Sequence, residues 1–461
     1  MSSEPTPTPP QSDEGIAGGF PLPSEARGVL EAARREGRGL TETERAIAQV
    51  EAFTPEEASA RIALNEAVEE DPGTRRPMII NLGPQHPSTH GVMRLITELD
   101  GETVLDLHPV IGYLHTGIEK QCENKTWWQA ITLVTRMDYL SPYSNTLAYC
   151  LSVEKLLGLE VPVRAQYLRV IMLELNRIAS HLVWLGTSGL ELGAISVFFF
   201  TYRERDAALD LGEMISGERM NSRYFQVGGC ADDMPEGFEA ELRRFIDAMP
   251  GHVDEYEQLV AENQIWLDRL VGVGVLPADE LIGLGATGPV LRAAGVSHDL
   301  RKSNPYTGYE RFEFDVPTFD NGDAYDRFRV RMREIRESTK IIRQALDSIP
   351  EGSHIADDRK VVLPPRDELA VSMEALIHHF KLVTEGYRVP AGEVYSGVES
   401  PRGEIGCHVV SDGGTKPYRV HMRDASFVNL QSLRPMAKGQ YLADLVAMIG
   451  SLDNVMGGVD R

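Results

Sequence analysis

Two histidines lie four residues apart in the stretch NLGPQHPSTHGVMRL, residues 81–95. A helix that carried His86 and His90 on one face, with a glutamate after the first, would suit the zinc site of a hydrolase. Pro87 argues against that site, because a proline disfavours helical conformation in the residue before it, and no glutamate follows His86. Taken alone, such histidines are more often structural groups than ligands. The glycines and prolines beside them nevertheless predict a rigid loop, which suits a binding site.

A second polar group lies in TRMDYLSPYSN, residues 135–145, where Arg136, Asp138 and Tyr139 precede a Ser-Pro pair at the expected start of a helix. A tyrosine hydroxyl has a pKa of about 10, so at neutral pH it still holds a proton that it can donate. These residues alone favour a structural interpretation, in which the stretch is a helix cap with an ion pair and a core tyrosine.

Further charged residues stand among apolar neighbours. In the segment 163–185, which has helical periodicity, Glu174, Arg177 and His181 are spaced three and four residues apart and form one polar stripe. Glu191 follows this segment, just before an aromatic run. A stripe of this kind is usually a buried network or an exposed face, and it acquires a function only beside a redox or binding site.

The stretch ESPRGEIG, residues 399–406, places Glu399, Arg402 and Glu404 around a proline and a glycine. Such a constrained, charged loop indicates more than a solvated face, although an ion pair between domains remains an alternative. The glycine pairs of the chain match neither a dinucleotide-binding fingerprint nor a phosphate-binding loop.

The elements that must position these residues indicate an α+β fold, with a central helical bundle and small β-rich parts before and after it. Residues 1–75 are expected to be an N-terminal extension, partly disordered. We expect a small β-rich segment at 76–125, a helical core at 126–350 and a C-terminal part at 351–461. Asp-Gly turns predict one hairpin near residue 100 and another near residue 412, and a final helix is expected from about 432.

Composition narrows the class of partner. The formal net charge of −23 argues against nucleic acid and against direct docking on anionic lipid. The four cysteines are far apart, so no thiolate set for zinc or an iron–sulfur cluster is expected, and no metal site is predicted. The first residues lack the features of a signal peptide, and the most apolar segment, 163–185, carries too many charges to span a bilayer. We therefore expect a cytoplasmic chain that meets a membrane only through partner proteins.

Nine segments resemble, in order, the D-subunit family of the proton-pumping NADH:quinone oxidoreductase, respiratory complex I. They run from about residue 80 to the C-terminus, so the first 75 residues lie outside the resemblance. One such segment alone is a weak signal, whereas nine in order are very specific. The segments are GPQHPSTHGV, IGYLHTGIEK, RMDYL, LNRIASHLVWLG, RERDAALDLGEMISGERM, VGG, PRGE, VSDGGTKPYR and LDNVMGGVDR.

The resemblance also implies the fold of the related nickel–iron hydrogenase large subunits. Those proteins hold their metals with four cysteines, in the motifs R-x-C-G-x-C and D-P-C-x-x-C. In this chain Asp138 and Ser141 occupy the first two cysteine positions, and Val455 and Gly458 occupy the last two. A nickel–iron centre cannot be held without these soft ligands, which excludes an active hydrogenase and leaves the cavity free for another substrate.

By resemblance, His90 and Tyr139 donate hydrogen bonds to the two carbonyl oxygens of a quinone, menaquinone or ubiquinone. Quinone reduction consumes two electrons and two protons, which explains the need for two positioned donors. Glu191 stands where the family usually has an aspartate paired with the histidine, and we expect it to pair with His90. Thr116 replaces an arginine that many relatives place beside the partner's iron–sulfur cluster.

The resemblance assigns other residues to the quinone pocket or to the vicinity of that cluster. Arg402 is expected to line the pocket, and His181 to hydrogen-bond near the cluster and link its potential to pH. The full set is His86, Arg136, Asp138, His181, Arg402 and Val455.

The expected function is therefore quinone reduction coupled to proton pumping. This chain binds no cofactor of its own in that interpretation, and electrons arrive from a 4Fe–4S cluster in the adjoining B-subunit. Expected partners are the B-, C-, I- and H-subunits, on the cytoplasmic side of the bacterial cell membrane, where the chain is peripheral. The main alternative is a non-catalytic hydrogenase-like scaffold in a membrane redox complex.

Overall fold

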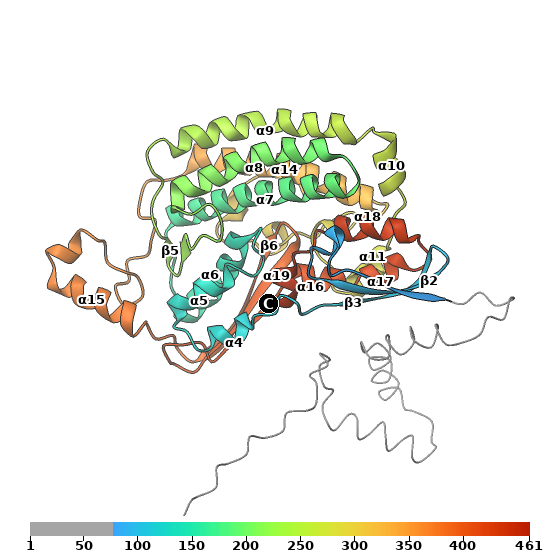
Figure 1. The fold of residues 1–461 in the computed structure, drawn as a ribbon. Coiled ribbons are helices and arrows are strands. Elements are labelled where there is room, and N and C mark those ends of the chain that lie inside the picture. The colour runs from blue at the N-terminus through green and yellow to red at the C-terminus, as the bar shows by residue number, and fades with distance from the viewer. Residues whose placement is uncertain (1–76) are drawn as a thin grey trace, which may run out of the picture. The chain divides into compact units, whose positions relative to one another are not determined.

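The computed structural model describes residues 77–461, and our predictions for residues 1–75 fall outside that range. The described part combines helices with small antiparallel sheets, which confirms the α+β class (Figure 1). One hydrophobic core cluster includes residues from Met93 to Val459. The boundaries proposed at 125 and 350 remain predictions.

Long helices form the layer at the top of Figure 1. They are α7 (Val163–Glu191), α8 (Ile195–Ser216), α9 (Phe238–Val260) and α14 (Ala324–Ser348). Helix α7 packs against both α8 and α14, and most of its residues are buried. A helix surrounded in this way is apolar on nearly every face. This burial explains why 163–185 is the most apolar long segment of the sequence. In the described part, no helix is long and apolar enough to cross a membrane.

Shorter helices connect and cover these elements. The early ones are α4 (Ile118–Cys122), α5 (Trp127–Val134) and α6 (Pro142–Leu157), and the middle ones are α10 (Gln264–Leu270), α11 (Ala278–Gly283), α12 (Pro289–Arg292) and α13 (Leu300–Ser303). The late ones are α15 (Met373–Thr384), α16 (Ala425–Leu430), α17 (Leu433–Ala437), α18 (Leu442–Leu452) and α19 (Met456–Asp460), with 3-10 turns η1 (Pro87–Thr89), η2 (Tyr309–Arg311) and η3 (Glu368–Ala370).

Two three-stranded sheets and one short ribbon make up the β structure of residues 77–461. The first sheet is β1 (Met78–Leu82), β2 (Arg94–Asp100) and β3 (Thr103–Val110), and the ribbon is β4 (Phe225–Gln226) with β5 (Gly229–Cys230). The second sheet is β6 (Gly392–Ser400), β7 (Gly403–Ser411) and β8 (Arg419–Arg423). The β2–β3 and β7–β8 connections confirm the hairpins predicted near residues 100 and 412.

The β6–β7 hairpin has a tight turn that carries a charge. Ser400 pairs with Gly403, so Pro401 and Arg402 form the turn between them. Gly403 has a φ of 130°, and a Cβ at this position would lie 2.5 Å from the Thr287 hydroxyl. Only glycine suits this backbone and this close approach. The constrained loop expected around Arg402 is therefore the tip of a hairpin.

The C-terminal segment ties the early and late parts of the chain together. The Asp460 carboxylate accepts hydrogen bonds from the backbone of Gly112 at 2.8 Å and of Leu114 at 2.7 Å. In addition, η1 packs against α18. These contacts bring the histidine loop and the last two helices into one region.

Candidate functional site

The histidine loop is held by its own side chains. His86 has an extended backbone, and its Nδ1 accepts a hydrogen bond of 3.2 Å from the backbone of Ser88, so it caps η1. The Thr89 hydroxyl donates to the carbonyl oxygens of Pro84 and His86 at 3.1 and 3.0 Å. The structure therefore gives His86 the structural role that its proline neighbour predicts.

His90 differs from His86 in conformation and in exposure. It ends η1 in the left-handed region, with a φ of 55°, and part of its surface remains open. The pKa of its imidazole is lowered, first because the surrounding protein keeps water away and second because the charge of Arg402 is near. The ring is consequently neutral at pH 7, with one N–H to donate.

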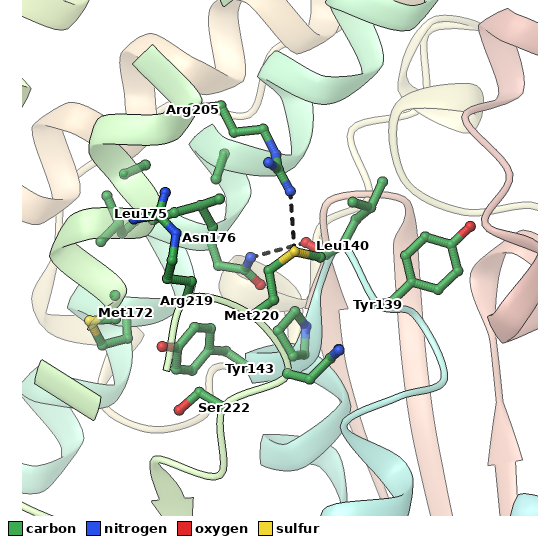
Figure 2. Close-up of a pocket in the computed structure, with 16 residues that line it drawn as sticks. Tyr139, Leu140, Tyr143, Met172, Leu175, Asn176, Arg205, Arg219, Met220 and Ser222 are labelled. Atoms are coloured by element: carbon green, nitrogen blue, oxygen red, sulfur yellow. Dashed lines mark hydrogen bonds between the residues drawn. The ribbon is translucent and has the colours of Figure 1, made fainter. Parts of the chain in front are cut away.

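Tyr139 lies in the short connection between α5 and α6, and its side chain is half-buried. Burial raises the pKa of its hydroxyl, Asp138 raises it further, and Arg402 opposes the rise. A Cβ at Gly457 would lie 3.1 Å from the Tyr139 ring, so the start of α19 packs closely against that ring. Figure 2 shows the hydroxyl pointing away from the other labelled residues of the adjoining pocket.

Arg402 joins the segment that carries Tyr139 to the segment between α18 and α19. Its guanidinium is fully buried and donates to Asp138 Oδ2 at 2.9 Å and to Asp453 Oδ1 at 3.2 Å. Its Nε donates to the Asp453 carbonyl oxygen at 2.8 Å. The charge of Arg402 acts on both Tyr139 and His90.

Three buried carboxyl groups surround this arginine: Asp138, Asp424 and Asp453. Burial is the largest cause that raises the pKa of both Asp424 and Asp453, to about 6. A Cβ at Gly458 would lie 2.4 Å from Asp424, so this position has no room for a side chain. Val455 is buried, and its backbone donates to the Ser426 hydroxyl at 3.2 Å.

Glu191 is the last residue of α7 and lines a small pocket with Trp184, Ser188 and Gly450. Burial raises the pKa of its carboxyl to about 7. A Cβ at Gly450 would lie 2.9 Å from Glu191 Oε2, so the carboxyl lies against α18. Within residues 77–461 no ion pair joins Glu191 to His90, so the expected pairing is not formed in this structure.

His181 is completely buried between helices. Its Nε2 lies 2.8 Å from Glu334 Oε2, and its Nδ1 has no hydrogen-bond partner among the described residues. Burial lowers the pKa of the ring to about 4, against the opposing effect of Glu334. In this chain the side chain of His181 is therefore part of the buried network of α7. Its expected position near a partner's cluster stays a prediction.

The rest of the polar stripe on α7 belongs to the same buried network. Glu174 accepts hydrogen bonds from Arg177, Arg301 and the Tyr309 hydroxyl, the last at 2.6 Å. Arg177 also donates to the backbone carbonyl of Ser400 at 3.0 Å. Through this bond the network holds the end of strand β6, next to the turn of the β6–β7 hairpin. Buried charges of this kind are paired because isolated ones would be very costly.

Arg136 is exposed and forms no ion pair with the described residues, and its expected position in the pocket or near a partner's cluster stays a prediction. Its guanidinium donates to the Thr132 carbonyl oxygen at 2.6 Å. This arginine therefore bonds to the backbone four residues before it and takes no part in the ion pairs of Arg402.

A surface pocket beside Tyr139 contains residues to which sequence analysis assigned no role. Its lining includes Asn176 of α7, Arg205 of α8, and Arg219 and Asn221 of the loop that follows (Figure 2). Arg219 is paired with acidic residues, whereas Arg205 stacks on the Tyr202 ring, with 5.5 Å to its centroid. The segment RERDAALDLGEMISGERM contains both arginines, but only folding shows that they border Tyr139.

Most of the chain is similar in sequence to known proteins of one family. Residues 191–461 match the family described as "Respiratory-chain NADH dehydrogenase, 49 Kd subunit". The chain is 56% identical over 392 residues to the NADH-quinone oxidoreductase D-subunit 2 of Roseiflexus sp. (strain RS-1), covering 84% of this chain and 94% of that relative. It is 55% identical to the NADH-quinone oxidoreductase D-subunit of Geotalea uraniireducens (strain Rf4), over 83% of this chain and 98% of that relative.

Proposed function

The chain belongs to the 49-kDa subunit family of the respiratory-chain NADH dehydrogenase, a part of the multisubunit NADH:quinone oxidoreductase, and from this premise we propose that it carries the site of quinone reduction. The observation that carries the proposal is the position of His90 and Tyr139. They come from separate segments, and the buried charge of Arg402 acts on both. One imidazole and one phenol beside a fixed charge form a pair of donors for two oxygens.

The chemistry follows from the protonation states. Neutral His90 and Tyr139 each donate a hydrogen bond to a quinone carbonyl oxygen. As two electrons arrive, negative charge develops on these oxygens, and it favours transfer of a proton from the phenol. The same charge raises the proton affinity of the His90 ring, which allows the imidazole to take up a proton and pass it on. The buried Arg402 stabilises the negative charge without being consumed.

The electrons in this proposal come from a 4Fe–4S cluster held by the adjoining B-subunit. Within residues 77–461, no group of three or more His, Cys, Asp or Glu side chains is arranged to hold a metal ion. The pocket beside Tyr139 is open at the surface, and Arg205 supplies positive charge there. Such a face suits an anionic cluster bound by thiolates, so we place the electron donor on this side.

Attachment to the membrane would run through other subunits of the complex. We propose the B-, C-, I- and H-subunits as neighbours and a peripheral position on the cytoplasmic side of the membrane. The apolar tail of the quinone would enter along an interface with a membrane subunit, and reduction would drive proton pumping. The joining of the two motif segments by Arg402 supports a nickel–iron hydrogenase ancestry for the fold.

A pair of histidine variants in the assembled complex tests the proposal. His90→Gln removes the imidazole that is open to the site, and quinone reduction should fall by about 100-fold, which is the low end of the contribution of a positioned proton donor. His86→Asn is the matched control, because asparagine is a good cap for a helical turn and His86 serves as a cap. NADH oxidation with an artificial acceptor should stay normal in both variants.

A non-catalytic scaffold would behave differently. In that case His90→Gln would keep the quinone reduction rate of the parent complex, and the proposal would be wrong.

A further inference from the structure

The carboxyl groups around Arg402 differ in their hydrogen bonding. Asp138 Oδ1 accepts from the backbone of Leu140 and Ser141, each at 3.1 Å, and its Oδ2 binds Arg402. Asp424 Oδ2 and Asp453 Oδ2 are buried and have no hydrogen-bond partner among the described residues. Two of the three carboxyl groups therefore keep a free oxygen inside the protein.

A free, buried carboxylate oxygen is costly, and a proton on it removes the charge that causes the cost. Three acids around one arginine also leave excess negative charge, which favours the uptake of a proton. Arg331 is buried nearby and adds positive charge to the Asp453 side. Asp453, which binds Arg402 and keeps a free oxygen, is thus able to hold a proton and release it.

Asp453 is linked to the segment of Tyr139 through Arg402, which binds both Asp453 and Asp138. It lies between α18 and α19 with a φ of 55°, a left-handed conformation that aspartate adopts more easily than most residues. Four residues later, Gly457 packs against the Tyr139 ring. The charge of Asp453 acts on the Tyr139 hydroxyl, whereas Asp424 is turned toward Gly458 and the start of α16.

We propose that Asp453 holds the proton that reloads Tyr139 after each reduction of quinone, an inference that rests on the proposed function. In the first step the Tyr139 O–H bond breaks as an O–H bond forms on the quinone oxygen. The phenolate then takes a proton from the Asp453 carboxyl, directly or through one water, and leaves an aspartate. Arg402 stabilises this aspartate until a proton from solvent restores it. The reloading steps move protons and no electrons.

The direction of the pH dependence follows from the groups that face Asp453. Burial raises its pKa to about 6 and Asp138 adds to the rise, whereas Arg402 and Arg331 oppose it; Tyr139 is neutral. The Asp453 carboxyl is mostly protonated below pH 6 and loses its proton as the pH rises above 6. Quinone reduction should therefore decline above pH 6 in the parent complex.

Two asparagine variants of the assembled complex test the assignment. Asp453→Asn keeps the left-handed backbone and the acceptor for Arg402 but cannot carry the proton. Quinone reduction should fall by at least about tenfold, and the decline above pH 6 should disappear. Asp424→Asn is the matched control: it removes a buried carboxyl of similar pKa and retains a capping group for α16, so rate and pH profile should remain unchanged. NADH oxidation with an artificial acceptor reports assembly.

Asp453→Gly covers the case in which the asparagine variant fails to assemble, because glycine also accepts the left-handed backbone. It should show the same loss of rate and of pH dependence. The inference is overturned if both Asp453 variants keep the parent rate and its decline above pH 6, or if Asp424→Asn shows the same loss. A normal rate in Asp453→Asn beside a collapsed rate in His90→Gln would sink this inference alone and leave the proposed function standing.

Discussion

Arg402 donates a hydrogen bond of 2.9 Å to Asp138, although 264 residues separate them in the chain. The pair is buried, and it fixes the tip of the β6–β7 hairpin against the connection that carries Tyr139. A second bond, to Asp453, adds the segment between α18 and α19. The geometry around Tyr139 therefore depends on one guanidinium that binds two carboxyl groups from opposite parts of the sequence.

Replacing this guanidinium by an ammonium group should disrupt the site. Arg402→Lys keeps the charge, but a lysine cannot make the fork of hydrogen bonds to both aspartates. Breaking a buried ion pair costs about 3–5 kcal/mol, so the temperature at which the complex loses quinone reduction should fall markedly. Arg434→Lys is the control, because its pair with Asp106 is exposed and such pairs contribute about 0–1 kcal/mol. Equal effects of the two variants would contradict this account.

The close contact between Gly457 and Tyr139 predicts a strong effect of one methyl group. In Gly457→Ala the new Cβ would lie 2.4 Å from the Met137 carbonyl oxygen, so the backbone beside Tyr139 must shift. Such overpacking typically costs about 1–3 kcal/mol, and quinone reduction should decrease with it. Gly251→Ala, in α9 with open space around it, should leave the rate of quinone reduction unchanged. Steady-state rates of both variants in the assembled complex measure the difference.

Glu191 should make the stability of the complex depend on pH. Its folded pKa, raised to about 7 by burial, exceeds the usual value of 4.5, so folding favours the protonated form. The stabilisation is fully present below pH 4.5 and is lost as the pH rises through 7. Glu191→Gln should therefore resist thermal inactivation better than the parent complex at pH 8, with a smaller advantage at pH 5. The same difference at both pH values would show that Glu191 ionises normally.

His181 should lower the stability of the folded complex at acidic pH. Burial lowers its folded pKa to about 4 from the usual 6.5, so the neutral ring is favoured in the folded chain. Its contribution is present above pH 6.5 and is lost as the pH falls toward 4. His181→Gln should lose less thermal stability than the parent complex between pH 6.5 and 5. An unchanged loss would mean that this ring does not titrate in that range.

Periodicity and turn chemistry predicted much of the fold. The apolar spacing of 163–185 corresponds to α7, and the Asp-Gly turns correspond to real hairpins. Within the predicted helical core, Asn263 caps the start of α10, so α9 and α10 are separate helices. Local sequence could not show which helices pack together, because that depends on contacts between residues far apart in the chain.

The site was predicted less evenly than the fold. Pro87 correctly indicated that His86 is not helical, and Arg402 was singled out because of its constrained loop. The sequence left open whether the polar stripe with His181 is a buried network or an exposed face, because the spacing of its residues is the same in both cases. The ion pair between Arg402 and Asp453 was also not predicted, because it depends on contacts between segments far apart in the chain.

The most direct measurement of the central claim is the quinone reduction rate of the assembled complex carrying Tyr139→Phe. Tyr143→Phe is the matched control: it removes a hydroxyl on the opposite, pocket side of the same segment (Figure 2). This account predicts that Tyr139→Phe loses quinone reduction by about 100-fold while NADH oxidation with an artificial acceptor survives, and that Tyr143→Phe keeps both activities. A normal rate of quinone reduction in Tyr139→Phe would contradict the account.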